Sequence, residues 1–375
     1  MNNRGYNSVL ICFGDPATDA RTLNIAGTLA SNGRKAAVIA PESQAGRETL
    51  NAKGIDYYPV KIPKGRVFIK WYAFNNKVIR IADQLSAQNV FAMDLYSLVP
   101  GTKLKTKLSS KLIYDAREIY SALGTLSGQN LKQHAVSAIE NMHTPAVDEF
   151  IVTGQLDAEY LKEHFKSAKP FHLVMNLPPK RLRALSSKLS DLYPESRDTF
   201  KLIYQGELLD GRGILTTMRA VKLTDNTSFF IIGSGPQENK LKHKAAELGL
   251  EGRTFFTGKV PYEMLHDYTL SADAGMALFR PLSLSYELAL PNKIFEYIMA
   301  GKPYISTGLP AIKQLTEKFN TGILTGYDPR PVDIADAINR LKDKTLYDNL
   351  AANAENASSE LNFESQIDTI LSISG

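Results

Sequence analysis

The first third of the chain alternates short apolar runs with segments in which apolar residues recur at helical spacing. The run SVLICFG at 8–14 ends in glycine and predicts a buried strand. In residues 15–33, apolar positions recur every three or four residues until Asn32-Gly33, which is typical of a helix and its end. AAVIA at 36–40 then predicts a second strand. The chain therefore opens with a strand, a helix and a strand, as parallel sheets do.

Further apolar runs continue this series, and a second series starts near residue 200. Before that point, strands are expected at 89–96, 111–116, 148–154 and 171–179, the last running through a double proline into a linker. After it, strands are expected at 200–206, 228–235, 253–259, 274–279 and 303–307. Helical patterns separate the strands of the second series. Alternating strands and helices predict an open parallel sheet covered on both faces, and two series predict two doubly wound domains.

Length and composition agree with two soluble globular domains. The chain has 375 residues, of which 43% are hydrophobic and 22% charged. No apolar run reaches the roughly 18 residues that span a bilayer, and we expect no signal peptide. The single cysteine, Cys12, lies in an apolar run and cannot form an intrachain disulfide. This favours a reducing cytoplasm, and a core position for Cys12 over a catalytic one.

The loops after the strands are the places to look for a ligand. In doubly wound sheets, ligands bind at the carboxyl ends of strands, where N–H groups at helix starts favour anions. Gly14 follows the first strand. Its two interpretations are a ligand-binding loop and a plain turn. Between Gly206 and Gly213, the sequence GELLDGRG places Arg212 between two glycines, a pattern that suits phosphate binding or a surface turn. Gly233, in GSGP, is more typical of a tight turn.

The stretch LPNKIFEYIMAGKPYIS carries a lone acid within an apolar helix. Leu290, Pro291 and Asn292 lead into the helix, whose first N–H groups favour an anion. Lys293 adds a cation, and Glu296 lies one turn further along. An ion pair between Lys293 and Glu296 on a solvated face is the simple alternative. The apolar flanks favour instead a carboxylate that accepts hydrogen bonds from a diol.

As a set, these motifs resemble the retaining group 1 glycosyltransferases, family 4, of the GT-B fold. The resemblance is carried by YQGELLDGRGI (204–214), FFIIGSGP (229–236), FFTGKVPYEML (255–265), SADAGMALF (271–279) and LPNKIFEYIMAGKPYIS (290–306). It is looser in the first half, through DPATDAR and IYDAREIYS. It implies an α/β protein with two Rossmann-like domains facing across a cleft. Residues 1–177 would bind the acceptor and residues 178–356 would bind the donor. A C-terminal helix in 357–375 would cross back to the first domain.

The resemblance also implies residue roles. The donor would be a UDP- or GDP-linked sugar, with Arg212 and Lys293 neutralising its diphosphate and Glu296 binding the ribose hydroxyls. The segment at Lys259 and Val260 would hold the base. The other implied donor-binding residues are Gly14, Gly206, Gly233, Leu290, Pro291 and Asn292. The loops at Gly14 and Arg117 would supply the acceptor side.

Three positions depart from the family pattern. The first acid of the family's E-x7-E pair falls at Leu288, a common arginine is replaced by Glu207, and D-x-H-E becomes Asp115-Ala116-Arg117-Glu118. Arginine does not deprotonate and so cannot act as a general base, so Arg117 would stabilise charge on the leaving phosphate instead. The departures leave open a catalytically silent relative that binds a nucleotide sugar or scaffolds a synthase. A nucleotide-sugar 2-epimerase is disfavoured, because the His/Asp/Glu cluster it needs is missing.

The implied mechanism needs neither a metal nor a strong protein base. The acceptor hydroxyl would attack on the face that the diphosphate leaves, and the phosphate would take the proton. No DxD motif lies in a plausible loop, and the histidines form no HxxxH or HxH pair. We therefore expect a metal-independent hexosyltransferase without a cofactor, acting in envelope or extracellular polysaccharide or glycolipid synthesis.

Residues 61–80 form a basic, aromatic segment with six basic side chains, no acid and the only tryptophan, Trp71. Such a segment suits the surface of an anionic membrane, and the net charge of +5 is compatible with it. A core helix with a solvated basic edge is the alternative, and no nucleic-acid partner is expected. A second basic cluster comprises Lys103, Lys105, Lys107 and Lys111. The membrane hypothesis predicts a cytoplasmic protein, peripheral at the inner face, with a glycan or lipid-linked acceptor.

Overall fold

A computed structural model describes residues 4–126 and 128–375 of the protein. Its contacts divide the chain into two compact units, which are described separately here. The first unit runs to Asn176 and also contains Gln366–Gly375, and the second is Leu177–Ser365. Of the expected crossing segment 357–375, the part that belongs to the first unit therefore begins at Gln366.

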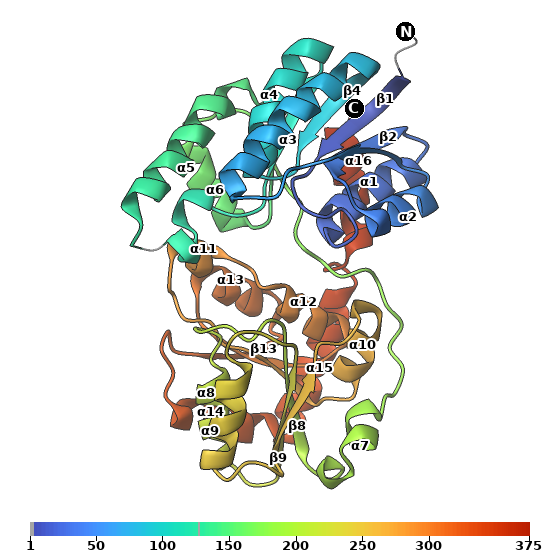
Figure 1. Cartoon of the computed structure of the whole chain (residues 1–375). Helices are drawn as coiled ribbons and strands as arrows, with labels where there is room; N and C mark the ends of the chain where they lie inside the picture. The colour runs from blue at the N-terminus through green and yellow to red at the C-terminus, as the bar shows by residue number, and fades with distance from the viewer. Residues whose placement is uncertain (1–3, 127) are drawn as a thin grey trace. The chain divides into compact units, whose positions relative to one another are not determined.

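The first unit is built on a parallel sheet in the order β3-β2-β1-β4-β5-β6-β7 (Figure 1). Its strands are β1 (Arg4–Ile11), β2 (Ala36–Pro41), β3 (Asp56–Val60), β4 (Leu85–Ala92), β5 (Lys111–Ala116), β6 (Glu149–Val152) and β7 (Phe171–Leu173). Its α-helices are α1 (Ala20–Ser31), α2 (Gln44–Ala52), α3 (Val67–Ile81), α4 (Leu95–Leu108), α5 (Asn130–His143), α6 (Gln155–His164) and α16 (Ile367–Ile373).

The C-terminal helix α16 packs against α1 of the first unit. Polar side chains of that unit bind the last carbonyl groups of the chain, as a helix C-terminus requires. Arg34 donates to the carbonyl of Leu371 at 2.8 Å, and Lys111 donates to that of Ile373 at 2.8 Å. Asn89 donates to the carbonyl of Ser374 at 2.7 Å. These bonds fix the chain's end on the first unit.

The second unit is built on a parallel sheet in the order β10-β9-β8-β11-β12-β13. Its strands are β8 (Phe200–Gln205), β9 (Thr227–Ile232), β10 (Thr254–Gly258), β11 (Ala274–Ala277), β12 (Tyr304–Thr307) and β13 (Gly322–Thr325). Its α-helices are α7 (Lys188–Leu192), α8 (Ile214–Lys222), α9 (Glu238–Glu247), α10 (Tyr262–Leu270), α11 (Leu284–Leu288), α12 (Asn292–Met299), α13 (Pro310–Phe319), α14 (Pro331–Leu341) and α15 (Lys344–Ser358). Helices α8, α9 and α14 pack together, and α12 packs with α10 and α15 (Figure 1).

The doubly wound fold class predicted from the sequence is confirmed, but each sheet has an edge strand that the pattern did not predict. In the first unit this strand is β3, whose residues are mostly half-buried and include Pro59. In the second unit it is β13, which has four residues. Proline and short length are common in edge strands, where one side of the ladder stays unpaired. Both features weaken the apolar signal on which the prediction relied.

In both sheets, the strand order reverses at a definite place. The chain runs outward from β1 to β3 and then returns to place β4 beside β1, and it does the same with β8 and β11. Such reversals leave a crevice at the carboxyl ends of the two adjacent strands, where ligands of these folds bind. In the second unit, the crevice is bordered by the residues that follow Gln205 and Ala277.

Helix α12 is fastened to the centre of the second sheet by Tyr297. The Tyr297 side chain is fully buried, and its hydroxyl donates to the carbonyls of Ile203 in β8 and Met276 in β11, at 3.2 and 3.1 Å. Its ring lies directly over Gly275 of β11, where an added Cβ would come within 2.2 Å of a ring carbon. The position of α12 therefore requires a residue without a side chain at 275.

Among the described residues, no helix is long and apolar enough to span a bilayer.

Substituting Gly275→Ala should lower the free energy of unfolding by about 1–3 kcal/mol, because the new methyl group displaces the Tyr297 ring. Urea denaturation followed by circular dichroism measures this loss. Gly252→Ala is the matched control, since nothing lies within 4 Å of its added Cβ, and it should leave the stability nearly unchanged. Equal stability of the two variants would contradict the packing described for Tyr297.

Candidate functional site

Two glycine turns meet beyond β8 and β9. Gly233 follows β9 with φ of +145°, and a Cβ added to it would lie 1.9 Å from the carbonyl oxygen of Gly206. The turns are also bonded to each other, since the Leu208 amide donates to the Ser234 carbonyl at 2.9 Å. Backbone therefore approaches backbone so closely that a side chain at 233 has no room. The turn predicted at Gly233 packs against the loop that begins at Gly206.

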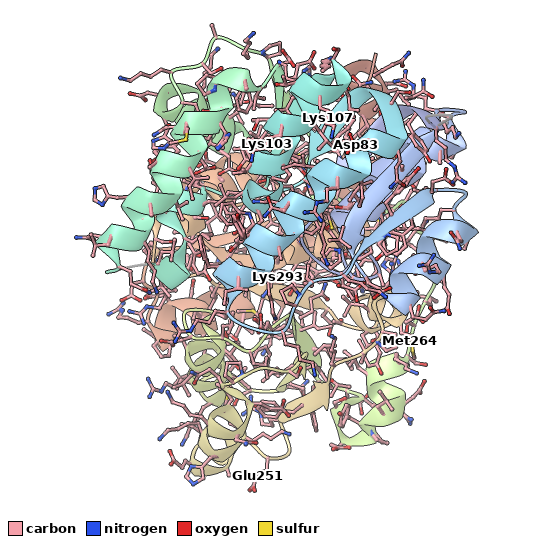
Figure 2. The ribbon with its side chains drawn as sticks, turned by 45° about the horizontal axis from the view of Figure 1, so that its top comes forward. Asp83, Lys103, Lys107, Glu251, Met264 and Lys293 are labelled. Atoms are coloured by element: carbon pink, nitrogen blue, oxygen red, sulfur yellow. The ribbon has the colours of Figure 1, made fainter. Side chains whose placement is uncertain are left out.

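Lys293, labelled in Figure 2, places its ammonium group beside Gly206 and Tyr204. Its Nζ lies 3.6 Å from the centroid of the Tyr204 ring and 5.1 Å from that of Phe279. A Cβ added to Gly206 would be 3.6 Å from the same nitrogen. Burial, followed by repulsion from Arg212, lowers the pKa of Lys293 well below its usual range. In the part of the chain that the structure describes, Lys293 has no carboxylate partner.

Arg212 approaches the same aromatic ring from the GELLDGRG loop. Its Cζ lies 5.0 Å from the Phe279 centroid and 4.9 Å from that of Tyr286. It donates one long hydrogen bond of 3.4 Å to the Tyr286 hydroxyl and, within the described ranges, pairs with no acid. The loop's shape depends on Gly213, where φ is +66° and an added Cβ would lie 2.4 Å from Leu278. Two basic side chains without an acidic partner among the described residues thus face one ring, an arrangement whose charge suits an anion.

A cavity of about 180 Å³ adjoins this loop. Its walls combine the loop around Arg212 and the first turn of α8 with basic side chains, including Lys240, Lys244 and Arg280. The exposed N–H groups of a helix start and several cations give this hollow a positive potential.

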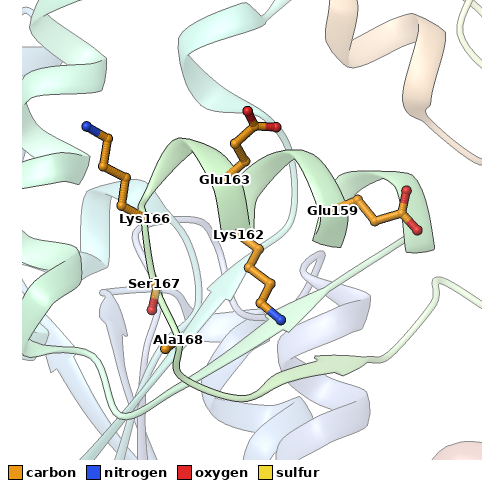
Figure 3. A pocket seen from close by; sticks show the side chains of 6 residues that line it. All are labelled: Glu159, Lys162, Glu163, Lys166, Ser167 and Ala168. Atoms are coloured by element: carbon orange, nitrogen blue, oxygen red, sulfur yellow. The ribbon is translucent and has the colours of Figure 1, made fainter.

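A larger hollow of about 530 Å³ lies in the first unit along α6 (Figure 3). It is lined by Glu159, Lys162, Glu163, Lys166, Ser167 and Ala168. It contains none of the residues that the sequence predicted for a site, and its mixed charges are typical of a solvated helix.

Glu296 is 6% exposed and is bonded to a side chain of another helix. Its Oε1 accepts a hydrogen bond of 2.7 Å from the Tyr262 hydroxyl, and the Arg181 guanidinium lies 4.8 Å from the Tyr262 ring centroid. Burial raises the pKa of Glu296, while the Tyr262 hydrogen bond and the Arg181 charge oppose that rise. Lys293 and Glu296 form no ion pair in the described structure, so the simple alternative from the sequence was wrong.

The remaining predicted donor residues lie on loops of the second unit. Lys259 is exposed and Val260 half-buried, directly after β10, and the Gly233 amide donates to the carbonyl of Gly258 at 2.9 Å. Pro291 is the N-cap of α12, which begins at Asn292. Leu290 immediately precedes this cap.

Two of the three departures from the family pattern, Leu288 and Glu207, lie in the second unit. Leu288 is the last residue of α11, and Glu287 before it is half-buried. Glu207 is exposed, and its backbone carbonyl accepts a bond of 2.7 Å from the Tyr204 hydroxyl. In the described residues, no group of three or more His, Cys, Asp or Glu side chains is arranged to hold a metal ion.

In the first unit, Arg117 is tied to its neighbours. Its Nη1 lies 2.9 Å from both carboxylate oxygens of Asp19, and its Nη2 donates to Thr22 at 2.8 Å. Its Nε contacts Asp115 at 3.3 Å. Arg21 donates to the same buried carboxylate from Nε at 2.6 Å and from Nη2 at 2.7 Å. Asp19 is also the N-cap of α1. Arg117 therefore lies in a compensated ionic network that joins α1 to the end of β5.

Gly14 follows β1 in an open turn, where an added Cβ would meet nothing within 4 Å. The structure places it at the carboxyl edge of the first sheet, on the same side as Arg117.

The basic segment 61–80 forms a loop and helix α3, whose first turns expose apolar side chains. Val67, Phe68, Ile69 and Tyr72 are 59, 69, 51 and 62% exposed. Among the residues that the structure places, none of the six basic side chains of this segment forms an ion pair.

The second basic cluster is different, because most of its charges are neutralised. Lys105 pairs with Asp148 at 2.6 Å, Lys107 with Asp83 at 2.5 Å (Figure 2), and Lys111 with Glu149 at 2.5 Å. The expectation of a second basic patch was wrong for these three residues, because their acidic partners come from other elements.

Tyr262 and Arg181 are site residues that sequence reasoning missed. Tyr262 lies in the quoted motif FFTGKVPYEML, but nothing in its spacing points to Glu296. Arg181 lies in the segment that precedes α7, where no pattern marked it.

Comparisons with known proteins agree with this architecture. The sequence model of the family described as "Glycosyl transferases group 1" matches residues 191–357, inside the second unit. Over 148 residues, the chain is 31% identical to the lipopolysaccharide core biosynthesis glycosyltransferase LpsD of Rhizobium meliloti (strain 1021). That alignment covers 39% of this chain and 40% of the relative, so the similarity spans less than half of either protein.

Solved structures match nearly the whole chain. The crystal structure of Anabaena Alr3699/HepE in complex with UDP-glucose matches with a TM-score of 0.78 at 17% identity, covering 98% of both chains. The sucrose-phosphate synthase (tll1590) from Thermosynechococcus elongatus matches with a TM-score of 0.79 at 17% identity, covering 99% of this chain and 98% of the other. At such identities these structures establish the fold. The chain therefore has the GT-B fold, and its second unit is similar to the glycosyl transferases group 1 family.

Proposed function

We propose that the protein is a retaining glycosyltransferase of family 4, which moves a hexose from a UDP- or GDP-linked donor to an acceptor hydroxyl. The observation that carries this proposal is the pair of uncompensated cations, Lys293 and Arg212, on the Phe279 ring. They lie beside the glycine turn that begins at Gly206. Basic groups placed before the reaction stabilise a diphosphate leaving group without further rearrangement of the protein.

The other groups of the second unit suit the rest of a nucleotide sugar. The N-terminal turn of α12 offers backbone N–H groups to phosphate oxygens. Glu296 retains acceptor capacity for the ribose hydroxyls, because Tyr262 occupies one of its oxygens only. The turn at Lys259 and Val260 would hold the base. Transfer with retention then lets the leaving phosphate accept the acceptor's proton, so that neither a protein base nor a metal is required.

The names of the relatives support the donor and acceptor classes. One similar structure holds UDP-glucose, and one relative acts in lipopolysaccharide core biosynthesis. We infer a nucleotide-linked hexose as the donor and an envelope glycan or lipid-linked sugar as the acceptor. The role predicted for Arg117 on the leaving phosphate remains a prediction, since its guanidinium already pairs with Asp19 and Asp115.

We further infer that the protein works in the cytoplasm at an anionic membrane surface, which α3 contacts. Exposed apolar side chains at the start of α3 lie among cations that carry no counter-charge in the described chain. This combination binds the interface of anionic bilayers.

A panel of UDP- and GDP-linked sugars tests the function. We expect one donor to raise the melting temperature and to be hydrolysed slowly. A shift without turnover, with or without lysate acceptors, would support the silent alternative, and the absence of any shift would overturn the proposal. Glu296→Ala should weaken binding of the same nucleotide about tenfold. Glu317→Ala, an exposed acid on α13, is the control and should bind normally. Unchanged affinity in Glu296→Ala would refute the ribose assignment.

Binding of inorganic pyrophosphate should be accompanied by proton uptake at Lys293. Because the pKa of Lys293 is lowered in the free protein, a bound anion restores the charged form and draws in a proton. Calorimetry near pH 8, in buffers of different ionisation enthalpy, measures the protons taken up. The wild type should take up more protons per bound pyrophosphate than Lys293→Arg, since arginine stays charged throughout. Equal uptake would show that Lys293 does not sense the anion.

Liposome sedimentation at low salt tests the membrane contact. The wild type should bind vesicles that contain anionic lipid and ignore neutral ones. Phe68→Ser should weaken this binding about tenfold, because it removes an inserted aromatic side chain. Leu223→Ser, which removes an apolar side chain 60% exposed on the second unit, should bind as the wild type does. Wild-type protein that ignores anionic vesicles would overturn the membrane proposal.

A further inference from the structure

Glu296 is held by a side chain from a different helix. Tyr262 lies in the first turn of α10, and its hydroxyl donates to Oε1 of Glu296 at 2.7 Å. The Arg181 guanidinium lies 4.8 Å from the Tyr262 ring centroid, so the ring is held between a cation and a carboxylate. Three segments far apart in the sequence thus meet around a single acid.

This contact leaves Glu296 able to bind a ligand. An ionised carboxylate offers about four acceptor positions, and the Tyr262 hydroxyl occupies one. The bond limits rotation of the carboxylate, so the second oxygen has a fixed direction. Glu296 is also the acid on which a diol would depend, because its usual upstream partner is Leu288 in this chain.

The groups that act on Glu296 determine whether it is ionised. They are Tyr262 from α10 and Arg181 from the segment before α7. Burial raises the pKa of Glu296, whereas the Tyr262 hydrogen bond and the Arg181 charge lower it. The ionised carboxylate accepts hydrogen bonds from both hydroxyls of a diol, whereas the protonated acid loses part of that capacity.

We propose that Tyr262, oriented by Arg181, is a positioning residue that fixes the Glu296 carboxylate and aims it at the ribose diol of the donor. The inference rests on the proposed function, because it needs a ribonucleotide in the second unit. Under this proposal, Tyr262 on α10 contributes to the preference for ribose over deoxyribose, although it lies outside α12.

The test compares UDP and GDP with their 2′-deoxy forms, using calorimetry between pH 5.5 and 8.5. Tyr262→Phe keeps the ring under Arg181 and removes the hydroxyl. For whichever nucleotide the wild type binds, this variant should lose about tenfold in affinity and much of the preference for the ribose form. Affinity should fall as the pH drops through the pKa of Glu296. In Tyr262→Phe this fall should occur at higher pH, because a bond to the ionised form is lost.

Two further variants isolate the effect. Arg181→Met should weaken the preference for ribose and move the fall in affinity to higher pH, as Tyr262→Phe does, but by less. Tyr347→Phe removes a hydroxyl bonded to the Asp273 carbonyl at 3.0 Å and should bind as the wild type does. If Tyr262→Phe left both the preference for ribose and the pH at which affinity falls unchanged, the role of Tyr262 would be overturned. This holds even if affinity fell equally for the ribose and deoxyribose forms. If the wild type binds neither UDP nor GDP, the proposed function itself fails.

Discussion

The candidate site depends on the way Tyr297 fastens α12 to the second sheet. Its hydroxyl bonds carbonyls of β8 and β11, the two strands whose carboxyl ends border the crevice, and its ring occupies the space above Gly275. Lys293 and Glu296 lie on the same short helix. Fixing the helix therefore fixes the ammonium group beside Tyr204 and the carboxylate beside Tyr262.

The cost of this arrangement is electrostatic. Lys293 is removed from water without an acid to compensate it, and Arg212 repels it. Burying an unpaired cation is unfavourable, and aromatic faces offset only part of that cost. An anion between the two side chains would relieve both the desolvation and the repulsion. A site that is unfavourable when empty and favourable when an anion is bound is preorganised for the charge that a diphosphate brings.

Sequence patterns predicted what depends on neighbours along the chain. The central strands, the glycine turns and the start of α12 follow from local apolar runs and turn residues, and they lie close to their predicted places. What the patterns missed depends on partners far away. Tyr262 and Arg181 reach Glu296 from other segments, and Lys105 and Lys107 are neutralised by Asp148 and Asp83. The edge strands were not predicted, because their half-buried positions carry a weak apolar signal.

The arginines show why charge in the sequence does not by itself identify a binding residue. Arg117 and Arg212 both follow a strand of a parallel sheet and both belong to motifs that suggested phosphate chemistry. Arg117 bonds to acids whose presence beside it depends on the fold, whereas Arg212 faces two aromatic rings. A compensated cation stabilises its own unit, and an uncompensated one still has its charge to offer a ligand. That difference, rather than the motif, is the reason for proposing anion binding in the second unit.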